Sequence, residues 1–142
     1  MQKTPTLARR CAAARCDDPG PRRAATRSLL CAPCRDRLDQ HLLDLPDLYA
    51  AMDQRLPGSP THPHAAEVRA AIRGVLATWA HVVVDGREVA RPVRSVTGMA
   101  RFLRRHVDWL GAHPAVTEIA GEIDELVSQV RHAGTSWLRD SA

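Results

Sequence analysis

The four cysteines of the chain lie within its first 34 residues and form two pairs. Four residues separate Cys11 from Cys16, and two separate Cys31 from Cys34. Such paired spacing is typical of a structural zinc site, because each short segment can bring two thiolates to about 2.3 Å from one ion. Four thiolates leave no coordination position for water or substrate. The pattern therefore predicts a closed, non-catalytic Zn²⁺ site at Cys11, Cys16, Cys31 and Cys34.

Two other states of these cysteines stay open at this point. In a reducing compartment they could be free thiols, and Cys31-Ala-Pro-Cys34 has the spacing of a redox pair. In an oxidising compartment they could form disulfides. The N-terminus has basic residues, but no apolar stretch follows them, so no secretory signal is expected. We therefore expect a cytoplasmic protein, and that location favours a metal over disulfides.

Charge is distributed unevenly along the 142 residues. Residues 1–40 contain nine basic and four acidic side chains, whereas residues 113–142 contain two basic and five acidic ones. A basic segment around a zinc site is suited to contact with nucleic-acid phosphates, although a solvated arginine-rich surface gives the same pattern. The candidate phosphate contacts are Arg9, Arg10, Arg22, Arg23 and Arg27.

Apolar periodicity predicts packed helices after the cysteines. Apolar side chains recur at spacings of three and four in 64–84, in 96–110, and from Pro114 to Gly134. Ser95 is a suitable N-cap, Pro114 a first helical residue and Gly134 a C-cap. Short connections favour antiparallel packing. The predicted fold class is mainly α, with a small treble-clef-like zinc finger of four cysteines followed by a three-helix antiparallel bundle.

The same patterns predict two modules. Residues 1–55 form the zinc-finger module with two short helices, the second of them capped by Asp44 with Pro46 in its first turn. Residues 56–63 contain three prolines and a glycine and are predicted to be a linker. Residues 64–142 are predicted to form the bundle and a short C-terminal tail, in which Trp137 either folds back or marks a partner surface.

A helix is expected to begin at the second cysteine pair, so that N–H groups of its first turn donate to the thiolates. His41 is the nearest further side chain that can bind a metal, and we interpret it as a surface imidazole. Four thiolates outweigh the charge of one divalent cation, and nearby arginines are expected to offset the difference. Those flanking the ligands in sequence are Arg9, Arg10, Arg15 and Arg35.

No catalytic constellation is recognisable, so neither an enzyme nor a small-molecule substrate is expected. The acidic residues near 120 are interpreted as a solvated helix face; they are Glu118, Glu122, Asp124 and Glu125. The longest uncharged apolar stretch, from Gly74 to Val84, is too short to span a bilayer, which takes about 20 residues. No membrane association is therefore expected.

A second group of arginines lies between 87 and 105. These side chains could contact phosphates or form the polar side of an amphipathic helix. They are Arg87, Arg91, Arg94, Arg101, Arg104 and Arg105. A helix-turn-helix built from the last two predicted helices is not favoured, because its recognition helix would present acidic side chains to DNA.

Three features together resemble a known family: the four cysteines, Leu-Leu-Asp-Leu-Pro-Asp-Leu-Tyr-Ala-Ala-Met-Asp at 42–53, and Phe-Leu-Arg-Arg-His-Val-Asp-Trp-Leu-Gly-Ala-His-Pro at 102–114. The family is an uncharacterised group of actinobacterial and actinophage proteins with an N-terminal four-cysteine zinc finger and a helical domain. Longer members continue into a zinc ribbon or a helix-turn-helix DNA-binding module. The resemblance covers roughly residues 9–133 and implies metal ligation at the four cysteines.

Two functional hypotheses follow. The first is a non-enzymatic zinc-finger protein of phage or actinobacterial origin, which acts in gene regulation through weakly specific DNA contact. The second is a protein–protein interaction adaptor that docks on a host or phage protein without touching DNA.

Overall fold

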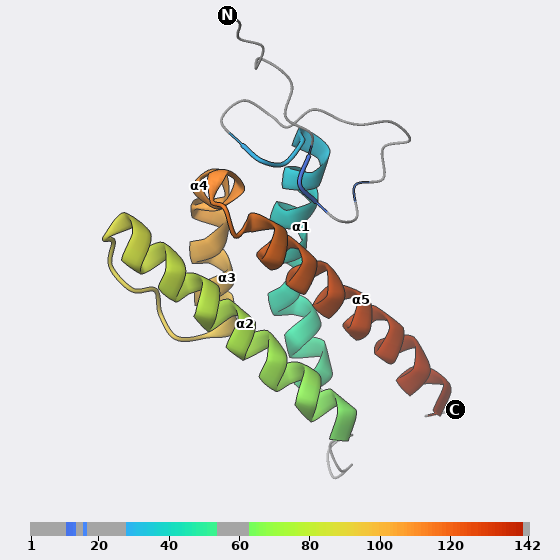
Figure 1. Ribbon diagram of the computed structural model, residues 1–142. Coiled ribbons are helices and arrows are strands. Elements are labelled where there is room, and N and C mark those ends of the chain that lie inside the picture. Colours follow the sequence, from blue (N-terminus) through green and yellow to red (C-terminus); the bar gives the residue numbers. More distant parts are fainter. Residues whose placement is uncertain (1–10, 14–15, 17–27, 54–62, 141–142) are drawn as a thin grey trace, which may run out of the picture.

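The computed structural model of the chain describes residues 11–13, 16, 28–53 and 63–140 (Figure 1). All regular secondary structure in this part of the chain is helical, as the sequence predicts. The predicted linker lies outside the described residues except for Pro63, which begins a helix.

Helix α1, Ala32–Asp53, is one continuous helix where two short ones were expected. Pro46 lies inside it and removes one backbone hydrogen bond. The helix continues because Leu42 and Leu45 beside the proline are fully buried, and their packing outweighs the missing bond. Asp44, the expected N-cap of a second helix, therefore lies in the middle of α1.

Four further helices follow: α2 at Pro63–Arg87, α3 at Val96–Arg105, α4 at Val107–Ala112 and α5 at Val116–Asp140. Their positions agree with the three periodic segments found in the sequence. The predicted N-cap at Ser95 is confirmed, because its Oγ accepts a hydrogen bond of 2.9 Å from the backbone N–H of Gly98.

The helices predicted at 96–110 and 114–134 differ from the structure in continuity and in length. His106, with φ −108° and ψ 17°, interrupts the first of these and separates α3 from α4. The other begins at Val116, two residues after Pro114. It continues past Gly134, which is therefore not a C-cap, so Trp137 lies in α5 instead of in a tail.

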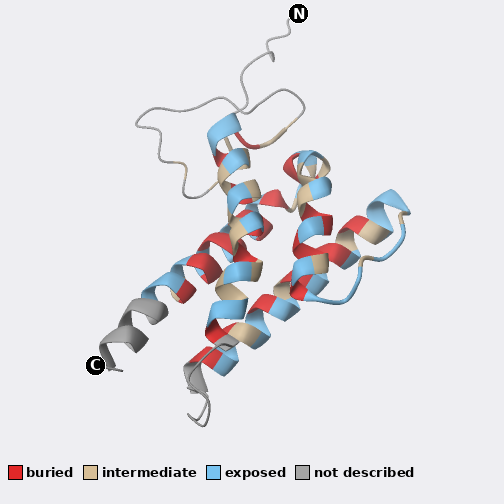
Figure 2. Ribbon diagram, turned by 180° about the vertical axis from the view of Figure 1, so that it is seen from behind, coloured by how far each residue is buried: buried red, intermediate tan, exposed pale blue. Residues whose placement is uncertain are grey.

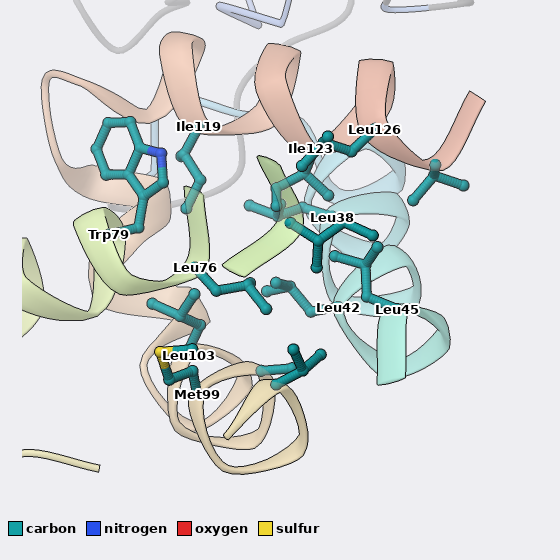
Figure 3. Close-up of a cluster of buried hydrophobic side chains, with 14 of the residues drawn as sticks. Leu38, Leu42, Leu45, Leu76, Trp79, Met99, Leu103, Ile119, Ile123 and Leu126 are labelled. Atoms are coloured by element: carbon teal, nitrogen blue, oxygen red, sulfur yellow. The ribbon is translucent and has the colours of Figure 1, made fainter. Parts of the chain in front are cut away.

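Four helices share one apolar core. α1 and α2 each pack against both α3 and α5, whereas α3 and α5 lie on opposite sides of the core (Figure 3). In Figure 2 the buried residues follow the inward faces of these helices. α1 supplies leucines to this core, so a three-helix bundle limited to 64–134 is not confirmed. The central side chains are Leu38, Leu42, Leu45, Leu76, Trp79, Met99, Leu103, Ile119, Ile123 and Leu126.

None of the helices within 28–53 and 63–140 combines the length and the apolar character that crossing a membrane requires. This finding agrees with the short apolar stretches of the sequence.

Two glycines test how tightly the helices pack. A Cβ at Gly74, exposed in α2, would meet nothing within 4 Å, whereas one at Gly98 would lie 2.7 Å from the backbone oxygen of Val93. We expect Gly74→Ala to raise the free energy of unfolding by about 0.5–1 kcal/mol, because alanine favours the helix. Gly98→Ala should lower it by about 1–3 kcal/mol, since the backbone must move. Urea unfolding followed by circular dichroism measures both, and equal effects would contradict the packing around Gly98.

Candidate metal centre

The four cysteine sulfurs form one cluster. All of them lie within 4.8 Å of one another, and Sγ of Cys16 is 3.9 Å from Sγ of Cys31. A tetrahedral site with metal–sulfur distances of about 2.3 Å has sulfur–sulfur distances of about 3.8 Å. All four cysteines are free thiols, and a disulfide would bring two sulfurs to about 2.05 Å. The cluster therefore has the dimensions of a four-thiolate metal site.

The second pair lies at the beginning of α1. Cys31 precedes the helix, and its carbonyl accepts the backbone N–H of Arg35 at 3.0 Å. Cys34 lies in the first turn, so both sulfurs are near the positive end of the helix dipole. The backbone N–H of Cys34 acts on the sulfur of Cys31 and opposes the effect of burial on the pKa of that thiol. The treble-clef arrangement as a whole is not confirmed, because most of the first segment lies outside the described residues.

Burial and sulfur–sulfur proximity control the protonation of the cluster. Burial raises the pKa of Cys31, and burial together with the neighbouring sulfurs raises the pKa of Cys34. Burial is the largest single influence on Cys11 and raises its pKa, but hydrogen bonds from the backbones of Cys31 and Ala13 and from the thiols of Cys31 and Cys34 together outweigh it, so the pKa of that thiol is lowered. Several thiolates crowded together are stable only beside a cation, so this donor set fits a thiophilic divalent ion.

Backbone hydrogen bonds attach the cysteine segments to the corner between α4 and α5. The N–H of Ala12 donates to the carbonyl of Leu29 at 2.8 Å, and the N–H of Leu29 donates to the carbonyl of Gly111 at 2.7 Å. The hydroxyl of Thr117 donates to the carbonyl of Ala12 at 3.4 Å. Leu30 is fully buried in the helical core. The cysteine cluster therefore packs directly against the helices.

Arg37 is a site residue that the sequence analysis missed. Its NH2 group lies 4.0 Å from Sγ of Cys34 and 3.5 Å from Oδ2 of Asp124 on α5. It follows Cys34 by three residues, and this helical spacing was the signal that could have identified it. Arg35, which was expected at the sulfurs, instead donates to Asp108 on α4 at 2.8 Å. The other arginines expected there lie outside the described residues; they are Arg9, Arg10 and Arg15.

Arg37 contacts a buried carboxylate, that of Asp124 on α5. Asp124 is the only buried charged residue in the described part of the chain, so its assignment to a solvated face was wrong. The surface assignment of His41 was wrong too, because its side chain is only 13% exposed and its Nδ1 lies 3.0 Å from Oδ1 of Asp124. Burial lowers the pKa of His41 and outweighs the opposing effect of Asp124. Asp124 thus joins α5 to the part of α1 that follows the metal centre.

Glu122 is exposed, which agrees with its assignment to the solvated face of α5. Its carboxylate accepts a hydrogen bond of 2.8 Å from Nε1 of Trp79 on α2. Trp79 itself lies in the core, so this bond satisfies the polar end of a buried aromatic side chain.

The five arginines predicted to contact nucleic acid are not placed by the structure. Arg9, Arg10, Arg22, Arg23 and Arg27 lie outside the described residues.

The chain matches no protein-family model, no curated protein and no solved structure. Its resemblance to the actinobacterial and actinophage family stays a prediction. The geometry of the cysteine cluster and the distribution of charge are the observations that bear on function.

Two aspartates allow the energetic effect of a buried ion pair to be compared with that of an exposed one. Asp124 is buried against Arg37 and His41, whereas the side chain of Asp108 is 81% exposed beside Arg35. We expect Asp124→Ala to lower the free energy of unfolding by about 2 kcal/mol, because it removes the buried carboxylate that faces the Arg37 guanidinium and the His41 imidazole. Asp108→Ala, the matched control, should change it by at most about 0.5 kcal/mol. Chemical denaturation tests both, and equal losses would show that burial at Asp124 has no energetic role.

Proposed function

We propose that this chain is a non-enzymatic zinc-binding helical protein that acts in gene regulation through weakly specific contact with DNA. The observation that carries the metal assignment is the approach of four cysteine sulfurs to within 4.8 Å of one another. Thiolate ligands suit Zn²⁺, Cu⁺ and iron–sulfur clusters, and a closed tetrahedral set of four is most typical of structural zinc.

The ion has a structural role in this proposal. It joins the segment around Cys11 and Cys16 to the beginning of α1, because its ligands come from both. Metal binding to such a site supplies folding free energy, which in small zinc modules is on the order of 10 kcal/mol. Zinc therefore orders the N-terminal segment beside the corner between α4 and α5.

DNA contact is proposed for the basic residues that surround this centre. Residues 1–40 contain nine basic and four acidic side chains, which leaves a net positive charge even beside a zinc–thiolate group. Arginines contact phosphates without reading sequence, so the expected binding is weakly specific. The contacts assigned to this segment are Arg9, Arg10, Arg22, Arg23 and Arg27.

Metal content tests the first half of the proposal. We expect the protein purified without chelators to contain one zinc ion per chain by elemental analysis. Cys31→Ser should lose that zinc, because the buried Cys31 sulfur is one of four ligands. His41→Gln is the matched control and should keep it, since the imidazole faces Asp124. Wild-type protein without zinc, or a Cys31→Ser variant that retains it at full stoichiometry, would contradict the assignment.

Salt dependence tests the second half. We expect the wild-type protein to bind a mixed-sequence DNA duplex with an affinity that falls steeply between about 50 and 200 mM salt, because phosphate contacts release counterions. Arg22→Gln/Arg23→Gln/Arg27→Gln should reduce the slope of log K against log salt by roughly 0.9 for each arginine that pairs with a phosphate. Fluorescence anisotropy measures both. Binding no stronger than that of an inert protein would contradict DNA contact and favour the adaptor hypothesis.

A further inference from the structure

A second basic surface lies away from the cysteine segment in sequence. Residues 86–106 contain six arginines and one acidic residue, Glu88. Arg104 is neutralised, because its Nε and NH2 atoms lie 3.1 and 3.2 Å from the carboxylate oxygens of Asp39 on α1. The other five are exposed and form no ion pair with a carboxylate within the described residues. We call them the α3 basic surface: Arg87, Arg91, Arg94, Arg101 and Arg105.

The arginines of this surface lie on three consecutive parts of the chain: the end of α2, the segment before α3, and α3 itself. Arg101 and Arg105 are four residues apart in α3, so they lie on one face about 6 Å apart along the axis. Arg94 directly precedes the N-cap of α3, and the segment that carries it returns from the end of α2 (Figure 1). NH1 of Arg87, the last residue of α2, lies 3.1 Å from Nδ1 of His106, which follows Arg105. The end of α2 thus lies beside the end of α3.

The pKa of His106 is affected by the arginines around it. Burial lowers the pKa of His106, and the charges of Arg87 and Arg105 lower it further. The imidazole accepts from Arg87 when it is neutral, so it adds no counter-charge to the surface. The charges of Arg87 and Arg105 thus act together at this corner, where Glu88 is the one acidic residue of 86–106.

The acidic residues that flank this surface in sequence have partners of their own. Asp85 contacts His81 on α2, and Asp108 contacts Arg35 on α1. Four more acidic residues lie between 118 and 125 on α5, which packs on the side of the core opposite α3 (Figure 3). The low-dielectric core of leucine, isoleucine and valine lies between them and the α3 basic surface. The acidic residues of α5 are therefore separated from this surface by the core.

The chemistry of this surface favours phosphate over protein as its ligand. Protein interfaces usually have an apolar or aromatic centre with a polar rim. Among the described residues the only large exposed hydrophobic side chains are Val93, which is 74% exposed, and Leu43, which lies on α1. One isolated valine among arginines does not form such a centre, whereas exposed guanidinium groups match phosphate oxygens.

We propose that the α3 basic surface binds the phosphate backbone of DNA as a second contact, separate from the arginine-rich N-terminal segment. The proposal takes its partner from the function proposed above and adds a contact made by the helical core. The contact does not involve the cysteines. A duplex bound there reads no bases through α3, because contacts to phosphate carry no direct sequence information.

The test compares two double variants of the full, zinc-loaded chain. Arg101→Gln/Arg105→Gln removes two charges from the α3 basic surface. Arg73→Gln/Arg131→Gln removes the same charge from arginines that contact Tyr49 and Asp44 and lie outside it. Circular dichroism confirms that both variants fold. We expect the first variant to lose about ten-fold or more in DNA affinity at about 50 mM salt, with a salt slope reduced by about two. The second should keep the wild-type slope.

The outcomes separate this proposal from the function on which it rests. If wild-type protein binds DNA and the α3 variant keeps the wild-type slope, the second contact is wrong while DNA binding stands. If wild-type protein does not bind DNA, both are wrong. If polyglutamate competes with the duplex at equal charge concentration, the surface recognises acidic polypeptide, and the phosphate assignment is overturned. A slope reduced only by the α3 variant, with no competition from polyglutamate, supports it.

Discussion

Burial of the leucine face of α1 is the interaction on which the rest of the structure depends. Leu38, Leu42 and Leu45 are almost completely removed from solvent between α3 and α5. Their packing keeps α1 helical through Pro46, and it fixes the position of the helix start, where two of the four cysteines lie. The cysteine cluster therefore takes its position from the apolar packing of the leucines that follow it in α1.

A chain of charged side chains connects the cysteine cluster to the contact between α1 and α5. Arg37 lies between a cysteine sulfur and Asp124, and Asp124 also faces His41. A zinc–thiolate group with four sulfurs carries net negative charge, and a guanidinium at this distance offsets part of it. The same arginine screens a buried carboxylate, so the metal site and the α1–α5 contact share one cation. Removal of the Cys34 thiolate or of the Asp124 carboxylate therefore changes the charge that Arg37 presents to the remaining one.

On the outer surface, the arginines differ in whether they pair with a carboxylate. Arginines on the α5 and α4 sides of α1 pair with aspartates, as Arg131 does with Asp44 and Arg35 with Asp108. Those around α3 mostly do not, because residues 86–106 offer one glutamate among six arginines. The helical core thus presents one side with balanced charge and one with excess positive charge. A protein that contacts DNA through its phosphates needs such an asymmetry more than it needs a high total charge.

The sequence by itself determined the helical class, the start of α3 at Ser95 and the grouping of the four cysteines, because each follows from short-range patterns of spacing and capping. It did not predict that α1 would continue through Pro46, that α5 would continue through Gly134, or that Asp124 and His41 would be buried together. Those outcomes depend on which faces meet in three dimensions, and apolar burial there outweighs local preference for a break or for solvent. Only the tertiary structure decided that Arg37 would approach a sulfur, that Arg104 would pair with Asp39, and that Arg101 and Arg105 would keep their charge exposed.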